Sequence, residues 1–185
     1  MTDYPDIVLI GYAGAGKSTA AQFLTEHLGY NRFAYAGVAE HPHPGSVRDL
    51  VTTLWGYSAI NDREKLIHVG NSMREIDEDV WIPPMELALM GDDTRPRIVD
   101  DCRFPNELAF LQGRGFVTVR VLAPRWLREE RLKANGKWIG PEYLDSPIEH
   151  HLDDEPFDHQ LLNDGTHSEL YEQILNMLNR ERAKR

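Results

Sequence analysis

The sequence contains little cysteine and no long apolar segment. With one cysteine, Cys102, in 185 residues, the chain cannot form an internal disulfide, and no Cys/His spacing typical of a zinc site is present. No apolar run approaches the roughly 20 residues that a membrane-spanning helix needs. The N-terminal residues also lack a basic segment followed by an apolar signal core. We therefore expect a protein of the reducing cytoplasm.

Basic side chains are also fewer than acidic ones. The chain carries 20 lysines and arginines against 30 aspartates and glutamates, which gives a formal net charge of −10. A charge of this sign opposes non-specific binding to a nucleic-acid backbone or to an anionic membrane, so we expect neither as a partner. A local basic cluster can still bind a small anion such as a mononucleotide.

The length and the order of the segments indicate one α/β domain. A chain of 185 residues buries enough surface to fold without disulfides or structural metal. Strand-like and helix-like segments alternate, which favours a parallel sheet covered on both faces. The expected strands cover residues 7–10, 32–35, 97–100, 117–122 and 159–163. The expected helices run from the loop after the first strand to Gly29, over 47–55, 63–73, 85–90 and 106–112, after Pro124, and around 170–178.

The most informative segment is a glycine-rich loop that directly follows the first apolar strand. Its sequence, Gly-Tyr-Ala-Gly-Ala-Gly-Lys-Ser, has the G-x-x-x-x-G-K-[ST] spacing of a phosphate-binding loop. In such a loop several backbone N–H groups converge on phosphate oxygens at the positive end of a helix. The residues expected to bind ATP here are Gly11, Ala13, Gly14, Ala15, Gly16, Lys17, Ser18 and Thr19. The alternative is a flexible glycine turn that merely joins a strand to a helix.

Two residues of this loop have individual roles. Lys17 places a cation in the first turn of a helix, which is electrostatically unfavourable unless an anion lies there. We therefore expect Lys17 to reach the β- and γ-phosphates and to act in catalysis. Ser18 is expected to hold Mg²⁺.

A second group of candidates follows the expected strand at 97–100. Asp100 and Asp101 lie where a P-loop fold needs an acid near its metal, and Asp101 is the preferred Mg²⁺ ligand. The alternative for both is capping of a turn. Arg103 is expected to grip a phosphate and to act in catalysis, its alternative being an ion pair with Glu107. Glu107 itself has two interpretations, orienting an arginine or contacting a substrate hydroxyl.

Three arginines follow Pro124 at helical spacing. Arg125, Arg128 and Arg131 recur at i, i+3 and i+6, which places them on about a third of one helix's circumference. We expect them to close over the phosphates, with Arg125 binding ATP and the other two acting in catalysis. The intervening glutamates leave an ordinary solvated helix as the alternative. Glycine turns at 135–136 and 140–141 suit a segment that opens and closes.

Four segments together resemble the phage-type deoxynucleoside monophosphate kinases of the P-loop group. Residues 99–107, Val-Asp-Asp-Cys-Arg-Phe-Pro-Asn-Glu, are similar to the family's D-x-R-F-P-N-E segment. Residues 66–81 resemble its L-x-x-x-G…R…W helix pair, and residues 162–166 its N-D-G-T turn. The loop at 11–18 is shared by the whole superfamily. Residues 146–149, Ser-Pro-Ile-Glu, replace the family's H-P-S-E segment.

The resemblance implies a fold, a reaction and further site residues. The fold is a five-stranded parallel sheet of order 2-3-1-4-5, with a core (1–35, 97–123 and 157–185), a monophosphate-binding insertion (about 36–96) and a lid (about 124–156). The reaction moves the γ-phosphoryl group of ATP, with Mg²⁺, onto a deoxynucleoside monophosphate. Arg74 would hold the acceptor phosphate, with Trp81, Arg103 and Glu107 as further acceptor-binding residues. Trp81 has two interpretations: it stacks on the acceptor base, or it anchors the insertion in the core.

Three other functions stay open at this point. A P-loop kinase for another small acceptor, such as a sugar acid or a coenzyme precursor, would keep the triphosphate site. A GTP-dependent switch is disfavoured because the chain has neither a D-x-x-G nor an N-K-x-D arrangement. A nucleotide-binding module without turnover is the third. The sequence also leaves open whether the chain forms a homodimer.

Overall fold

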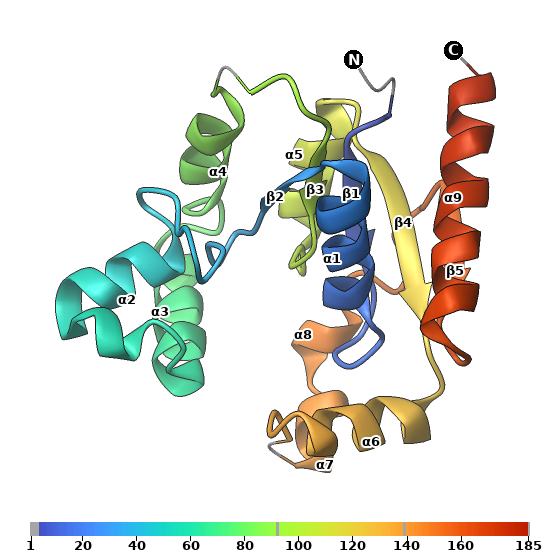
Figure 1. The fold of residues 1–185 in the computed structure, drawn as a ribbon. Coiled ribbons are helices and arrows are strands. Elements are labelled where there is room, and N and C mark those ends of the chain that lie inside the picture. The colour runs from blue at the N-terminus through green and yellow to red at the C-terminus, as the bar shows by residue number, and fades with distance from the viewer. Residues whose placement is uncertain (1–3, 92, 139, 185) are drawn as a thin grey trace. The chain divides into compact units, whose positions relative to one another are not determined.

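The computed structural model describes residues 4–91, 93–138 and 140–184 and divides the chain into two compact units (Figure 1). One unit comprises the chain up to Asn31 and from Arg95 onward, and the other comprises Arg32–Thr94. No helix within the described ranges has both the length and the apolar character needed to cross a membrane.

A five-stranded sheet forms the frame of the protein. Its strand order is β2-β3-β1-β4-β5, and β1 pairs in parallel with β3 and β4, as does β4 with β5. The strands are β1 (Ile7–Ile10), β2 (Asn31–Phe33), β3 (Arg97–Val99), β4 (Val117–Leu122) and β5 (His159–Leu162). The predicted parallel sheet of order 2-3-1-4-5 is confirmed. Its central strand leads into the glycine-rich loop.

Both faces of the central strand are buried. Ile7 and Leu9 pack in a core cluster with residues of α1 (Lys17–Leu28) and α9 (His167–Ala183). The alternate residues Val8 and Ile10 point to the opposite face and have no exposed surface. Burial on both faces explains why β1 reads as a continuous apolar run rather than as an alternating one.

Besides the end of β2, the described residues of the second unit form three α-helices and a short 3₁₀ segment. They are α2 (Val47–Trp55), η1 (Tyr57–Ala59), α3 (Arg63–Ile76) and α4 (Ile82–Leu89). The sequence predicted that α4 begins at Met85, after two prolines. The helix instead begins at Ile82, because prolines in the first turn lose no intrahelical hydrogen bond. Similarly, α3 extends three residues beyond the expected end at Met73.

Helices also follow β3 and β4 in the first unit. They are α5 (Pro105–Gly113), α6 (Arg125–Ala134), α7 (Pro141–Leu144) and α8 (Pro147–His150). The sequence predicted α5 and α6, but it predicted no helix in the region of α7 and α8. Helices of four residues are too short to show a 3.6-residue periodicity, so the apolar pattern could not reveal them.

Candidate active site

The loop between β1 and α1 has the backbone of an anion-binding site. Gly11, Gly14 and Gly16 adopt φ angles of 134°, 76° and 104°, which side chains other than glycine rarely allow. A Cβ atom on Gly16 would lie 1.9 Å from the side-chain nitrogen of Asn163. Helix α1, all of whose residues are described, has no acidic residue in its first turn and no side-chain cap. Its N-terminal N–H groups are therefore available to an anion.

Lys17 lies inside this loop. The residue is 9% exposed, and its ammonium donates to the carbonyl oxygens of Gly11 at 2.5 Å and of Tyr12 at 3.0 Å. Burial lowers the pKa of Lys17 to about 8, and the nearby Arg103 guanidinium acts in the same direction. The buried charge is thus costly, and phosphate oxygens would stabilise it.

The end of β3 brings two carboxylates near this lysine. Asp100 is 4% exposed and Asp101 is half-buried, and the negative charge of each raises the pKa of Lys17. Ser18 is exposed in the first turn of α1. The described residues contain no cluster of three or more metal-ligating side chains. This donor set fits a Mg²⁺ ion that takes a hydroxyl and a carboxylate from the protein and its other ligands from phosphates and water.

Glu107 is buried and caps helix α5. Its carboxylate accepts hydrogen bonds from the backbone N–H groups of Arg103 at 3.1 Å and of Phe104 at 3.3 Å. Of its surface, 2% is exposed. Among the interpretations given to Glu107, the contacts fit the orientation of an arginine, because this carboxylate fixes the backbone of Arg103.

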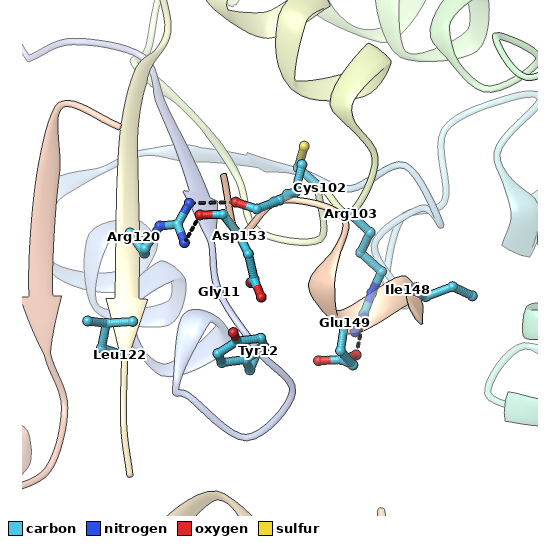
Figure 2. A pocket seen from close by; sticks show the side chains of 10 residues that line it. Gly11, Tyr12, Cys102, Arg103, Arg120, Leu122, Ile148, Glu149 and Asp153 are labelled. Carbon is cyan, nitrogen blue, oxygen red and sulfur yellow. Dashed lines mark hydrogen bonds and ion pairs between the residues drawn. The ribbon is translucent and has the colours of Figure 1, made fainter. Parts of the chain in front are cut away.

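The side chain of Arg103 forms an ion pair with Glu149 of α8 (Figure 2). Glu149 also accepts a hydrogen bond of 2.5 Å from the backbone N–H of Ala13 in the glycine-rich loop. Although burial alone raises the pKa of Glu149, the Arg103 guanidinium, the Ala13 N–H and Lys17 together hold it below its usual value. Glu149 was not among the predicted site residues, and it lies 46 residues from Arg103 and 136 from Ala13.

The three arginines of α6 have different surroundings. Arg128 is 7% exposed and lies over the ring of Tyr12, with its guanidinium carbon 4.5 Å from the ring centroid. Its Nε and Nη1 atoms are buried and have no hydrogen-bond partner among the described residues. Burial lowers the pKa of Arg128, and the charge of Glu149 partly offsets this effect. Arg128 therefore places an unsatisfied cation beside the loop.

Arg125 and Arg131 are engaged elsewhere. Arg125 is exposed and pairs with Asp145 and Glu129. Arg131 donates to the backbone oxygen of Asn163 at 3.0 Å and to its side-chain oxygen at 3.3 Å, and the Asn163 amide donates to Ala15 in the loop at 2.8 Å. Arg131 thus supports the loop through Asn163 in this state of the protein.

A small pocket adjoins the loop at the carboxyl ends of β1, β3 and β4. Figure 2 shows Arg103 and Glu149 turned toward one another at one side of it, with Tyr12 below. On its other side, Arg120 of β4 donates to the carbonyl oxygens of Leu152, Asp153 and Glu155 at 2.5, 3.1 and 3.0 Å. Arg120 therefore fastens the segment that follows α8.

The second unit places its two candidates around one carbonyl group. Arg74 Nη1 and Trp81 Nε1 both donate to the carbonyl oxygen of Gly70, at 3.1 and 3.2 Å. Trp81 is 4% exposed. This burial fits the anchoring interpretation of Trp81 rather than stacking on a base. Arg74 lies in the last turn of α3.

The chain matches no protein-family model and no curated protein, but solved structures share its fold. A shikimate kinase from Aquifex aeolicus vf5 aligns with a TM-score of 0.59 at 16% identity, covering 96% of this chain and 98% of that one. A gluconokinase from Sinorhizobium meliloti 1021 aligns with a TM-score of 0.57 at 18% identity, covering 95% of this chain and 92% of that one. A shikimate kinase from Acinetobacter baumannii in complex with shikimate aligns with a TM-score of 0.57 at 18% identity, covering 97% of this chain and 95% of that one. Together with the sheet order and the glycine-rich loop, these likenesses assign the P-loop NTPase fold to this chain.

Proposed function

We propose that the protein is an ATP-dependent phosphotransferase that moves the γ-phosphoryl group of ATP, with Mg²⁺, to a small acceptor. The observation that carries the proposal is the placement of Lys17 and Arg128 against the glycine-rich loop. Both cations are buried, and burial lowers the pKa of each. Such cations stabilise the charge that develops on a transferred phosphoryl group in a site that excludes water.

The chemistry assigns a role to each group of this site. The loop N–H groups and Lys17 would bind the β- and γ-phosphates, and Ser18 with Asp101 would hold Mg²⁺, which supplies charge neutralisation between those phosphates. Arg103 and Arg128 would stabilise the phosphoryl group in transit. No strong general base is required, because positioning and electrostatics account for most of the catalysis in this reaction class.

We propose a deoxynucleoside monophosphate as the acceptor, on the strength of the segments at 66–81 and 99–107. The second unit, with Arg74, would be the acceptor-binding region. A second candidate is a kinase for a hydroxylated carboxylic acid, because the solved structures named above are those of shikimate kinases and a gluconokinase. In either case the triphosphate site is the same.

One assay separates the two acceptor classes. ADP release, measured with a coupled assay and MgATP, is compared across the common nucleoside and deoxynucleoside monophosphates and across sugar acids and shikimate. Turnover that depends on a deoxynucleoside monophosphate supports the first proposal, and turnover with an acid supports the second. ATP binding with no turnover on any acceptor would contradict the assignment as a kinase.

Arg74→Ala is expected to raise the KM for the monophosphate by about tenfold to a hundredfold, because charge-assisted hydrogen bonds to an anion are among the strong ones. The KM for ATP is expected to change much less. Initial rates measured against each substrate in turn give the two values. Lys65→Ala, also on α3, removes a charge paired with Asp62 and is the matched control. Equal effects of Arg74→Ala on both KM values would move Arg74 out of the acceptor site.

The lowered pKa of Lys17 predicts a pH dependence of ATP binding. Without a bound phosphate Lys17 has a pKa of about 8, and the charges of a bound triphosphate would raise it. Between these two pKa values binding takes up a proton, so the affinity for ATP falls as pH rises above 8. Titration calorimetry at pH 9 in buffers of different ionisation enthalpy measures the uptake directly. Zero uptake would contradict a phosphate-contacting Lys17.

A further inference from the structure

Glu149 occupies an environment that suits a bound anion. Its side chain is 1% exposed, and it receives the N–H of Ala13 from the glycine-rich loop and the guanidinium of Arg103. Lys17 also lies close enough to lower the pKa of Glu149, and the charge of Glu149 in turn raises the pKa of Arg128. The carboxylate therefore contacts one loop N–H group and one guanidinium, and two further cations lie within electrostatic range of it.

These four groups are the ones that the proposed phosphotransferase site would offer to phosphate. Ala13 belongs to the loop, and Lys17, Arg103 and Arg128 are the cations that carry the proposed function. Two anions cannot share one N–H group and one guanidinium without strong repulsion at low dielectric. A triphosphate that uses these donors must therefore replace the carboxylate.

We propose that Glu149 is an internal stand-in for phosphate, which fills the anion site of the nucleotide-free protein and leaves it when a nucleoside triphosphate binds. This inference rests on the proposed function. The exchange keeps an anion on Arg103 and on the Ala13 N–H group in both states, which avoids leaving these donors without an acceptor. The exchange also couples triphosphate binding to catalysis. Arg103 becomes available to the phosphoryl group only after the triphosphate has displaced Glu149.

The chain around α8 is built for a local movement of this kind. Before α8, Gly136 and Gly140 adopt φ angles of 63° and 116°, which mark sharp turns in the connection from α6. After α8, Arg120 fastens the carbonyl groups of residues 152–155 to β4. Helix α7, whose Leu144 packs with Ala13 and Leu132, lies between these turns and the four-residue helix that carries Glu149. Because α8 is not part of the sheet, a shift of α8 can withdraw the carboxylate without breaking the strand pairing.

The exchange makes nucleotide binding weaker than the loop alone would allow. Part of the binding free energy is used to displace Glu149. The apparent Kd therefore equals the intrinsic Kd divided by the fraction of protein in which Glu149 has left the site. Removing the charge of Glu149 while keeping its shape should therefore strengthen binding. A carboxylate that merely supports the loop would give the opposite result.

Glu149→Gln tests this difference with titration calorimetry of MgATP. We expect the Kd to fall by about tenfold, because the neutral amide competes poorly with phosphate for Arg103 and the Ala13 N–H. Asp154→Asn removes the same charge from an exposed position of the same segment and should leave the Kd unchanged. An unchanged or higher Kd in Glu149→Gln, with wild-type binding intact, overturns the inference. Failure of the wild-type protein to bind MgATP overturns the proposed function, and this inference with it.

Hydrogen exchange of the wild-type protein provides a test that does not depend on any variant. A non-hydrolysable ATP analogue with Mg²⁺ should slow amide exchange in residues 11–18, because phosphate oxygens accept their N–H groups. The same analogue should speed exchange in residues 146–151, because α8 loses the contacts that Glu149 makes with Arg103 and Ala13. Slower exchange in both segments would show that Glu149 stays in place and would overturn the inference.

Discussion

Lys17→Ala is expected to lower kcat for phosphoryl transfer by about two to three orders of magnitude, the usual loss when one preorganised charge donor is removed from an active site. This ammonium is buried and donates to the carbonyl groups of Gly11 and Tyr12, so it holds the loop around the expected position of the phosphates. Single-turnover measurements at saturating MgATP separate the chemical step from binding.

The control for this variant is a lysine that lies outside the site and pairs with a carboxylate. Lys184→Ala removes a charge that contacts Glu181 at the end of α9, and it should leave turnover unchanged. The far-ultraviolet circular dichroism of Lys17→Ala should match that of the wild-type protein. Near-normal turnover in Lys17→Ala would remove this residue from the catalytic assignment.

Arg128→Met is expected to lower kcat by a similar factor and, unlike most active-site changes, to raise the stability of the nucleotide-free protein. Two buried nitrogen atoms of Arg128 have no hydrogen-bond partner within the described ranges, and each such atom costs about 1–3 kcal/mol. Methionine fills much of the same volume over the Tyr12 ring without that cost. Urea unfolding without nucleotide, together with kcat, measures both effects.

The opposite signs of these two effects make the prediction specific. A purely structural arginine would give a less stable protein when replaced, with turnover falling only as the folded fraction falls. Lys133→Met on the same helix removes an exposed charge and should change neither quantity greatly. If Arg128→Met is less stable and retains its turnover, the residue has a packing role and the cation beside the loop is not catalytic.

The strands and the longer helices were predictable, in their order, because each of them has a local signal. The run at Ile7–Ile10, the glycine spacing that follows it and the helical stripe ending at Gly29 are all properties of neighbouring residues. The start of α4 was misplaced because the prolines at 83 and 84 were taken as a boundary, whereas a helix accepts proline in its first turn.

The site was predictable only where a residue type and a local motif coincide. The loop and Lys17 have such a motif, and so do the carboxylates after β3. Glu149 lies in a segment that matches the family pattern only in part, and its significance comes from contacts with residues far away in the sequence. The helical spacing of Arg125, Arg128 and Arg131 likewise gave no information on which of them turns toward the loop. The packing of α6 against Gly14 and Tyr12 decides that, and it is a tertiary property.

The bond from Asn163 to Ala15 has a consequence for how this chain matures. Asn163 follows β5, the last strand to be synthesised, yet it is 3% exposed and braces a loop made near the beginning of the chain. A nascent polypeptide that has not yet docked that edge strand lacks the brace. Its glycine-rich turn then keeps the local bonds of Lys17 but lacks support at Ala15, so the complete loop forms only once synthesis has nearly finished.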